Sequence, residues 1–362
     1  MRPFPFAGAA FGALALLTSS ARAQTITTLV IEGQTIPGIG DVTFISNFDV
    51  NDNGDWLVEV DTDGPNTMDA VVLDASGLVL QEDQLVTVPG FPMAAISSFD
   101  SVRLNNLGNT CWNHFLRNTA TGFASGVYWN NTLVILEGDD TAPISSLPAP
   151  NPWTGFFEVF INDLNQLLVM GSVNEPTLGT STTDRFLVRL TLDGAGMVTS
   201  SVVVGKEDDM LPGMGATGRL DDFDSASNAY GFNNNGDAIF IADIDTPVNG
   251  DKIIYTWIGG VYTPIAEEGT PAFFDMTRNW DFLDRGVDMN DSGQYVFTGS
   301  LDGDTATDDV IIKNGALFKQ EGDTFAAISP FQLSGTFAVG GGSSNVRIDN
   351  GGNAVWPGSW ND

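Results

Sequence analysis

The stretch that decides the fold is Val50-Asn-Asp-Asn-Gly-Asp-Trp-Leu-Val-Glu-Val60, in which an Asn-rich turn leads into an apolar strand. The same arrangement recurs along the chain, and each copy follows one apolar residue. The six turns are Asn51-Asp-Asn-Gly54, Asn105-Asn-Leu-Gly108, Asn162-Asp-Leu-Asn165, Asn233-Asn-Asn-Gly236, Asn290-Asp-Ser-Gly293 and Asp349-Asn-Gly-Gly352. Asn and Gly adopt the positive φ angles that tight turns require. The recurrence therefore predicts a repeated β-hairpin.

A second hairpin follows in most copies, and its last strand ends in an acidic residue. Its tight turns are Ser76-Gly77, Asn130-Asn131, Gly259-Gly260 and Asn314-Gly315. The glutamates at the strand ends include Glu32, Glu137, Glu268 and Glu321. We interpret them as structural, because one recurs in most units. Each unit therefore reads as four antiparallel strands with no helical periodicity.

A four-stranded meander cannot bury both of its faces alone, so the units must stack. Radial stacking into a β-propeller hides most strand edges, and we predict an all-β propeller of four-stranded antiparallel blades. We expect one domain over residues 24–362. Its units span about 47–90, 100–140, 158–213, 226–270, 284–323, and 345–362 together with 25–38. The last unit would be a composite blade made from both ends of the chain, which gives six blades.

Residues 1–23 have the pattern of a secretory signal peptide. Arg2 precedes a short apolar core, and Ala21-Arg22-Ala23 has the small-x-small form of a cleavage site. We expect cleavage after Ala23 and a secreted or cell-surface protein. No later apolar run reaches the roughly 18 residues that a spanning helix needs, so we expect no membrane span.

The composition excludes several classes of function. The chain has 46 acidic and 14 basic residues and a formal net charge of −32, which disfavours nucleic acid and anionic membranes as partners. Cys111 is the only cysteine and His114 the only histidine. An internal disulfide framework, a Cys/His zinc site and Ser-His-Asp catalysis are therefore not expected.

The combination of Asn-x-x-Gly before a strand and Glu-Gly-Asp after one resembles a family of exported bacterial repeat proteins of unknown function. The second motif stands here as Glu137-Gly-Asp139 and Glu321-Gly-Asp323, and its variant as Glu32-Gly-Gln-Thr-Ile-Pro-Gly38. The resemblance covers about residues 25–362. It implies a propeller-like fold and implies no activity. Members of the family often carry a C-terminal sorting tail.

Four charged residues occupy equivalent positions, five residues before their turn glycine: Asp49, Arg103, Asp288 and Arg347. If the first strand of each unit lines the central axis, these side chains converge at one mouth of the channel. They are our candidates for binding a small polar ligand. The alternative is a set of structural salt bridges between neighbouring blades.

Two acidic loops are candidates for Ca²⁺, because closely spaced carboxylates suit that ion. One contains Asp302, Asp304 and Asp308, and the other contains Asp243, Asp245 and Asp251. Asp49-Val-Asn-Asp-Asn-Gly54 also begins like a calcium loop, but Val60 stands where that loop needs its bidentate acid. We interpret that segment as a turn.

The sequence favours a non-catalytic exported protein with a binding, surface or matrix role. Glycans or other extracellular proteins are the candidate partners. Two alternatives remain open: a carbohydrate-active hydrolase or lyase on a propeller scaffold, and a calcium-stabilised structural module. An enzyme would break the repeat at one cleft with convergent acids and an Arg or Tyr.

Overall fold

Antiparallel strands and their turns form the described part of the chain. The computed structural model describes residues 28–141, 152–173, 184–213, 218–223, 228–245, 252–283, 286–324, 330–335, 346–356 and 358–360. Its strands follow the repeat. The first sheet contains β1 (Thr35–Ile36), β2 (Gly40–Val50), β3 (Trp56–Thr62), β4 (Ala70–Asp74) and β5 (Gly77–Gln81). The second contains β6 (Ala95–Leu104), β7 (Thr110–Thr119), β8 (Gly122–Trp129) and β9 (Thr132–Leu136).

Three further sheets repeat the same meander. The third contains β10 (Trp153–Ile161), β11 (Gln166–Val173), β12 (Asp184–Leu192) and β13 (Val198–Lys206). In the fourth, β14 (Leu220–Phe223) and β15 (Tyr230–Phe232) both pair with β16 (Ala238–Ile244), followed by β17 (Lys252–Ile258) and β18 (Val261–Glu267). The fifth contains β19 (Pro271–Ala272), β20 (Asp275–Phe282), β21 (Val287–Met289), β22 (Tyr295–Leu301), β23 (Asp309–Lys313) and β24 (Ala316–Gln320).

The last unit contains only two strand positions within the described residues. Its first strand is split into β25 (Leu333–Gly335) and β26 (Arg347–Ile348), and its second into β27 (Ala354–Val355) and β28 (Ser359–Trp360). β26 pairs with β27 and β25 pairs with β28. The unit therefore has the geometry of a first hairpin, as its sequence predicts.

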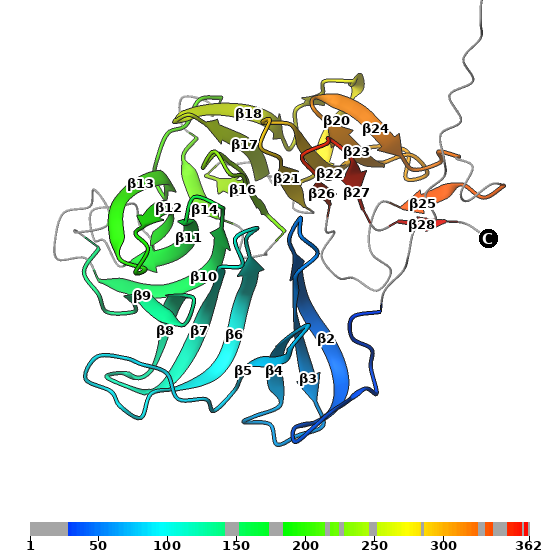
Figure 1. Cartoon of the computed structure of the whole chain (residues 1–362). Helices are drawn as coiled ribbons and strands as arrows, with labels where there is room; N and C mark the ends of the chain where they lie inside the picture. Colours follow the sequence, from blue (N-terminus) through cyan, green and yellow to red (C-terminus); the bar gives the residue numbers. More distant parts are fainter. Residues whose placement is uncertain are drawn as a thin grey trace, which may run out of the picture.

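The sheets are arranged radially around one axis, as Figure 1 shows. The inner strands of successive sheets contact one another, including β2 with β6, β6 with β10, β15 with β21, and β21 with β26. The largest hydrophobic cluster joins side chains of the third, fourth and fifth sheets, and another joins the second and third. The core thus lies between sheets, and the chain is a β-propeller of four-stranded antiparallel blades.

The composite blade expected from the two ends of the chain is not formed by the described residues. Residues 28–34 lie outside strands, and β1 pairs with β2 of the first blade instead. Residues 25–27 lie outside the described part. The physical reason is local: Thr35 and Ile36 fold back on Asp41 and Gly40 through a tight turn. Closure of a sixth blade stays a prediction.

The six Asn-rich turns form a hydrogen-bonded relay around the axis. In each of the first five turns, the leading Asn donates its Nδ2–H to the first backbone carbonyl of the next turn, at 2.9–3.0 Å. The second residue's N–H donates to a side-chain oxygen of its counterpart in the next turn, at 2.7–2.9 Å. The relay explains why these turns require Asn. Asp349 is the first residue of the sixth turn. Its carboxyl group, when ionised, has no hydrogen, so it cannot donate the bond that the leading Asn donates in the other turns.

Candidate functional site

All four candidate ligand-binding residues line one cavity at the propeller axis. This axial cavity has a volume of about 460 Å³, and its lining consists of Asn47, Phe48, Asp49, Val50, Arg103, Asp288, Arg347, Ile348, Asp349 and Val355. The residues come from blades one, two and five and from the C-terminal hairpin. The four side chains that strand position brought together thus line one cavity, and their role in binding a ligand stays a prediction.

The repeat explains why charge gathers on one side of the axis. Blades three and four carry Phe160 and Gly231 at the position that is charged in the other units. At Gly231, an added Cβ would lie 2.8 Å from the Cα of Asp288, so a side chain does not fit there without a backbone shift. The charged positions are thus consecutive around the axis, from blade five through the C-terminal hairpin to blades one and two.

Asp49 and Asp288 each accept a hydrogen bond from the neighbouring blade or hairpin. Asp49 accepts a hydrogen bond from the backbone N–H of Leu104 at 2.7 Å. Asp288 accepts one from the backbone N–H of Ile348 at 2.8 Å. In both bonds the N–H donor belongs to the residue that directly follows an arginine, either Arg103 or Arg347. The two Asp–Arg combinations are therefore equivalent by repeat position and by contact.

The side chains of Asp49 and Asp288 are partly buried in the cavity wall and partly exposed to the cavity. Burial raises the pKa of Asp49, and the charge of Arg103 opposes this shift. Burial also raises the pKa of Asp288, and Arg347 opposes it. The negative charge of Asp49 adds to the rise at Asp288. The two acids therefore interact electrostatically within one site.

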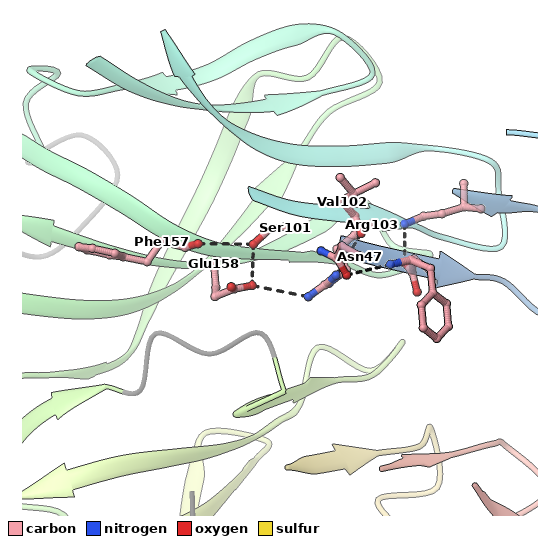
Figure 2. A network of polar contacts seen from close by, with 9 residues as sticks. Asn47, Ser101, Val102, Arg103, Phe157 and Glu158 are labelled. Carbon is pink, nitrogen blue, oxygen red and sulfur yellow. Dashed lines mark hydrogen bonds and ion pairs between the residues drawn. The ribbon is translucent and has the colours of Figure 1, made fainter. Parts of the chain in front are cut away.

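Arg103 is held by a network that the sequence did not predict. Its guanidinium lies over the ring of Phe160, 4.7 Å from the centroid, and Nη1 donates to the carbonyl of Val102 at 3.0 Å. Nη2 lies 3.5 Å from Oε2 of the buried Glu158. Ser101 donates to the same Oε2 at 2.6 Å, as Figure 2 shows. The arginine is thereby fixed before any ligand arrives.

A β-bulge creates this network. The pairing of β6 with β7 shifts register between Asp100 and Arg103, and Ser101 has a φ of 53°. The extra residue turns Ser101 toward the third blade. Phe160 is the residue of the third blade that is equivalent to Arg103, and Glu158 lies two positions before it. A comparison of equivalent positions in the repeat therefore does not identify Glu158. Only the three-dimensional structure brings these side chains together.

The cavity exists because the first blade and the C-terminal hairpin do not pack tightly. Val50 is 56% exposed, whereas its equivalents Met289 and Ile348 are 3% and 7% exposed. Val355 is 69% exposed, whereas its equivalent Val296 is fully buried against Ile348. The last interface of the ring is therefore an open seam, and the axial cavity lies in it.

The first acidic loop is organised by an arginine. The guanidinium of Arg278 donates to the carbonyl oxygens of Leu301, Asp302, Asp304 and Thr307. The Asp302 carboxylate accepts from the backbone and side chain of Asn279. Because a guanidinium already engages the loop's oxygens, the structure does not gather Asp302, Asp304 and Asp308 into a calcium ligand set.

The second acidic loop is likewise not gathered around one point. Asp243 forms an ion pair of 2.7 Å with Lys252. Asp245 is exposed at the end of β16, and Asp251 lies outside the described residues. Throughout the described ranges, no group of three or more His, Cys, Asp and Glu side chains is placed to hold a metal ion. Those metal-ligand predictions are therefore not supported by the geometry.

Two of the recurring glutamates, Glu137 and Glu268, have a structural role within their blades, as do Glu82 and Glu207 at the equivalent positions of the first and third blades. Each accepts a hydrogen bond from a backbone N–H of the third strand: Glu82 from Ala70, Glu137 from Ser125, Glu207 from Arg185 and Glu268 from Lys252. Glu268 also accepts from Leu283 of the next blade. These bonds give the recurrence a structural reason that needs no catalytic role.

The axial cavity offers hydrogen-bond acceptors, donors and apolar surface in one place. Three aspartates and two arginines line a space bordered by the exposed side chains of Phe48, Val50 and Val355. Such a site suits a small ligand with several polar groups and one apolar face.

No helix of the described residues is long and apolar enough to cross a membrane.

Comparison with known proteins concerns the fold. No family model and no curated protein matches the chain. The polysaccharide lyase Uly1 is similar over 73% of this chain, with 13% identity and a TM-score of 0.38, and this chain spans 56% of the lyase's length. A protein of unknown function from Dyadobacter fermentans has 9% identity and a TM-score of 0.39, with 87% of this chain and 89% of that one covered. The α-L-arabinanase of Penicillium chrysogenum has 12% identity and a TM-score of 0.36, with 79% and 82% covered. At these values, the likenesses carry no argument about activity.

Proposed function

We propose that the chain is an exported, non-catalytic binding protein whose axial cavity holds a sugar residue of an extracellular glycan. The observation that carries this proposal is the convergence of Asp49, Arg103, Asp288 and Arg347 on one cavity beside exposed apolar side chains. Sugar hydroxyl groups both donate and accept hydrogen bonds, and the C–H face of a sugar ring packs on an aromatic ring. Carboxylates, guanidinium groups and Phe48 match these groups in kind.

Export rests on the signal-peptide pattern of residues 1–23, and we further propose that the chain belongs to the exported repeat family that it resembles. The strongly negative surface is in keeping with an extracellular protein. Fixed positions for Arg103 and both aspartates favour binding, because a pre-organised site loses less entropy when a ligand is bound.

Calorimetric titration of the protein with single sugars tests this function. The probes are glucose, galactose, N-acetylglucosamine and glucuronic acid, followed by oligosaccharides of any sugar that binds. Asp49→Asn keeps an oxygen that accepts the Leu104 N–H, yet it removes the charge. We expect Asp49→Asn and Asp288→Asn each to weaken binding by roughly tenfold, as loss of a charged hydrogen bond does.

Asp281→Asn is the matched control, because Asp281 is exposed and lies outside the cavity lining. It removes the same charge and leaves affinity unchanged in our proposal. Equal weakening by all three variants would mean that general surface charge, and not the cavity, determines binding. Failure of every sugar to bind would remove the glycan from the proposal.

A hydrolase or lyase is the second candidate, favoured by one observation. Asp49 and Asp288 both have raised pKa values and interact electrostatically in the cavity. A glycosidase uses two carboxyl groups, one of them protonated. Chromatography of an oligosaccharide after incubation with the protein separates the two functions. We expect the sugar to be recovered intact; release of products by the native protein and not by Asp288→Asn would establish the enzyme.

A further inference from the structure

A second cavity lies between blades one and two, on the side of the ring that carries the Asn-rich turns. This inter-blade cavity has a volume of about 370 Å³, which is ordinary for a small-ligand site. Every lining residue lies between Gly54 and Asn131, within the continuously described segment 28–141. The inter-blade cavity shares no lining residue with the axial cavity. It is therefore a separate candidate site.

In blades three and five, one long side chain of the third strand fills the equivalent space. Both side chains occupy the position opposite the third residue after the Asn-rich turn, and they are Arg189 and Lys313. Each one reaches the turn glycine of the next unit. Arg189 donates to the carbonyl of Gly236 at 2.7 Å, and Lys313 donates to that of Gly352.

Blade one carries the short Asp74 at this position. Oδ1 of Asp74 accepts three hydrogen bonds from Ser76 and Gly77 of its own hairpin turn, at 2.6–3.1 Å. A Cβ added at Gly108, the turn glycine of blade two, would have no heavy atom within 4 Å beyond its chain neighbours. The space that a long side chain fills between other blades is therefore a cavity here.

The inter-blade cavity brings aromatic rings and carboxylates together. Trp56 is half-buried and Trp112 is 1% exposed, and both line the cavity with Asp55 and Asp74. No lysine or arginine is among the described residues that line it. Trp112 stacks on His114 at 5.9 Å between ring centroids, and burial lowers the pKa of His114 to about 3, so this ring is uncharged at neutral pH. The lining therefore combines indole surface with net negative charge.

Negative charge beside an indole face is complementary to an organic cation. A neutral sugar would also pack on an indole, but it would leave the charge of both carboxylates unbalanced. The carboxylates already accept hydrogen bonds, Asp74 within its turn and Asp55 from Nδ2 of Asn51 at 3.0 Å. They offer charge more than new acceptor positions, which favours a cation that carries no N–H donors.

We propose that the inter-blade cavity binds a quaternary ammonium group. Its methyl groups pack on Trp56, and its charge faces Asp55 and Asp74. The proposal does not depend on sugar binding in the axial cavity, because the two sites have no residue in common.

Calorimetric titration of the whole protein with choline chloride tests the aromatic part of the site. We expect saturable binding that weakens roughly tenfold in Trp56→Ala, as loss of a cation–π contact does. Tyr295→Ala is the matched control, because Tyr295 is the half-buried aromatic residue at the same repeat position of blade five and lies outside the cavity lining. It leaves the affinity for choline unchanged.

Asp74→Asn tests the charge, since it keeps an oxygen that can accept the N–H groups of its turn. We expect roughly threefold weaker binding of choline, as loss of one partly exposed charge contact does. Asp193→Asn is the matched control: Asp193 likewise accepts two backbone N–H groups of its own turn, and it lies outside the cavity lining. It leaves the affinity unchanged.

Four results would overturn the proposal. They are no saturable binding of choline, equally tight binding of the neutral analogue in which carbon replaces the nitrogen, weakening by a control variant as large as that by its test variant, and weakening by Asp288→Asn. The last would mean that choline lies in the axial cavity. Failure of every sugar to bind would leave choline binding unchanged, so the two proposals fail separately.

Discussion

Arg278 is the residue that best explains how a strongly acidic loop stays folded. Its guanidinium donates to four backbone carbonyl oxygens between Leu301 and Thr307. Four carbonyl oxygens of the loop therefore converge on one cation. From the sequence, the same acids suggested calcium, because the position of Arg278 on the neighbouring strand β20 cannot be read from the loop.

Arg278→Ala should lower the free energy of unfolding by about 2 kcal/mol, because four carbonyls, three of them in partly buried bonds, lose a charged donor. Urea unfolding monitored by tryptophan fluorescence measures this change. Arg219→Ala is the control: Arg219 is half exposed and, among the described residues, donates to a single carbonyl, that of Asp208. A loss at Arg219 as large as that at Arg278 would contradict the account.

Calcium should not stabilise the native protein, since the carbonyl oxygens that it would need are engaged by Arg278. Thermal unfolding in EDTA and then in millimolar Ca²⁺ measures this directly, because an ion that binds only the folded state raises the midpoint. We expect the two midpoints to agree. A clear rise with Ca²⁺ would restore the calcium-stabilised module as an explanation of the acidic loops.

Several buried acids make stability depend on pH. Burial, together with the charges of Asp100 and Asp61, raises the pKa of Glu59 to about 7. Burial raises the pKa of Glu207 to about 7 and that of Asp100 to about 6. A carboxyl whose pKa is raised binds more protons in the folded state than in the unfolded state. Its contribution to stability is present below the unfolded pKa and is lost as the pH rises through the folded value.

The protein should therefore be less stable at pH 8 than at pH 5, with most of the loss between the ordinary glutamate pKa of 4.5 and about 7. Urea midpoints across this range measure the slope. Glu59→Gln removes one titrating group and should flatten the curve. Stability that rises steadily from pH 5 to pH 8 would mean that these carboxyls are ionised in the folded protein without penalty.

At the scale of elements, the Asn-rich turn is the feature that joins one blade to the next. Its positive φ angles and its place before a strand are local properties, so the sequence alone predicted them. Its bonds to the next turn were not predicted, because they join residues 54 to 71 positions apart. The bulge at Ser101 and the acceptor role of Glu158 were missed for the same reason.

Asn233→Ala should cost about 3 kcal/mol, because the buried amide serves two backbone N–H groups and one carbonyl, and all would lose their partner. Asn51→Ala should cost about 1 kcal/mol, since Asn51 lies at the partly exposed seam end of the relay. Denaturant unfolding of both variants checks the difference. Equal losses would mean that the relay does not depend on burial.

At the scale of the whole molecule, hydrophobic clusters join each of the first five blades to the next, whereas among the described residues no such cluster joins the C-terminal hairpin to blade one. The repeated four-stranded unit predicted a propeller, and strand position predicted the four charged residues at the axis. The seam was not foreseen, since the predicted composite blade would have closed it. Its exposed residues, Val50 and Val355, have the same character as buried residues at equivalent positions, so only packing distinguishes them.

Native-state hydrogen exchange should follow this packing. Amides of β11 and β16 lie in the largest clusters and should exchange only by global unfolding. Amides of β26 and β27 belong to a small cluster beside the seam and should exchange much faster. Comparable protection of all these strands would contradict an open seam.

The central claim is that the axial cavity at the seam binds a sugar, and a hydrogen-exchange footprint tests it most directly. The protein is labelled with and without the sugar that binds most tightly in calorimetry. The account predicts slower exchange in residues 47–50, 103–105, 287–289, 346–349 and 354–355, which contain the cavity lining. Protection confined to the cavity between blades one and two, around Trp56 and Trp112, or no change near Asp49 and Asp288, would contradict it.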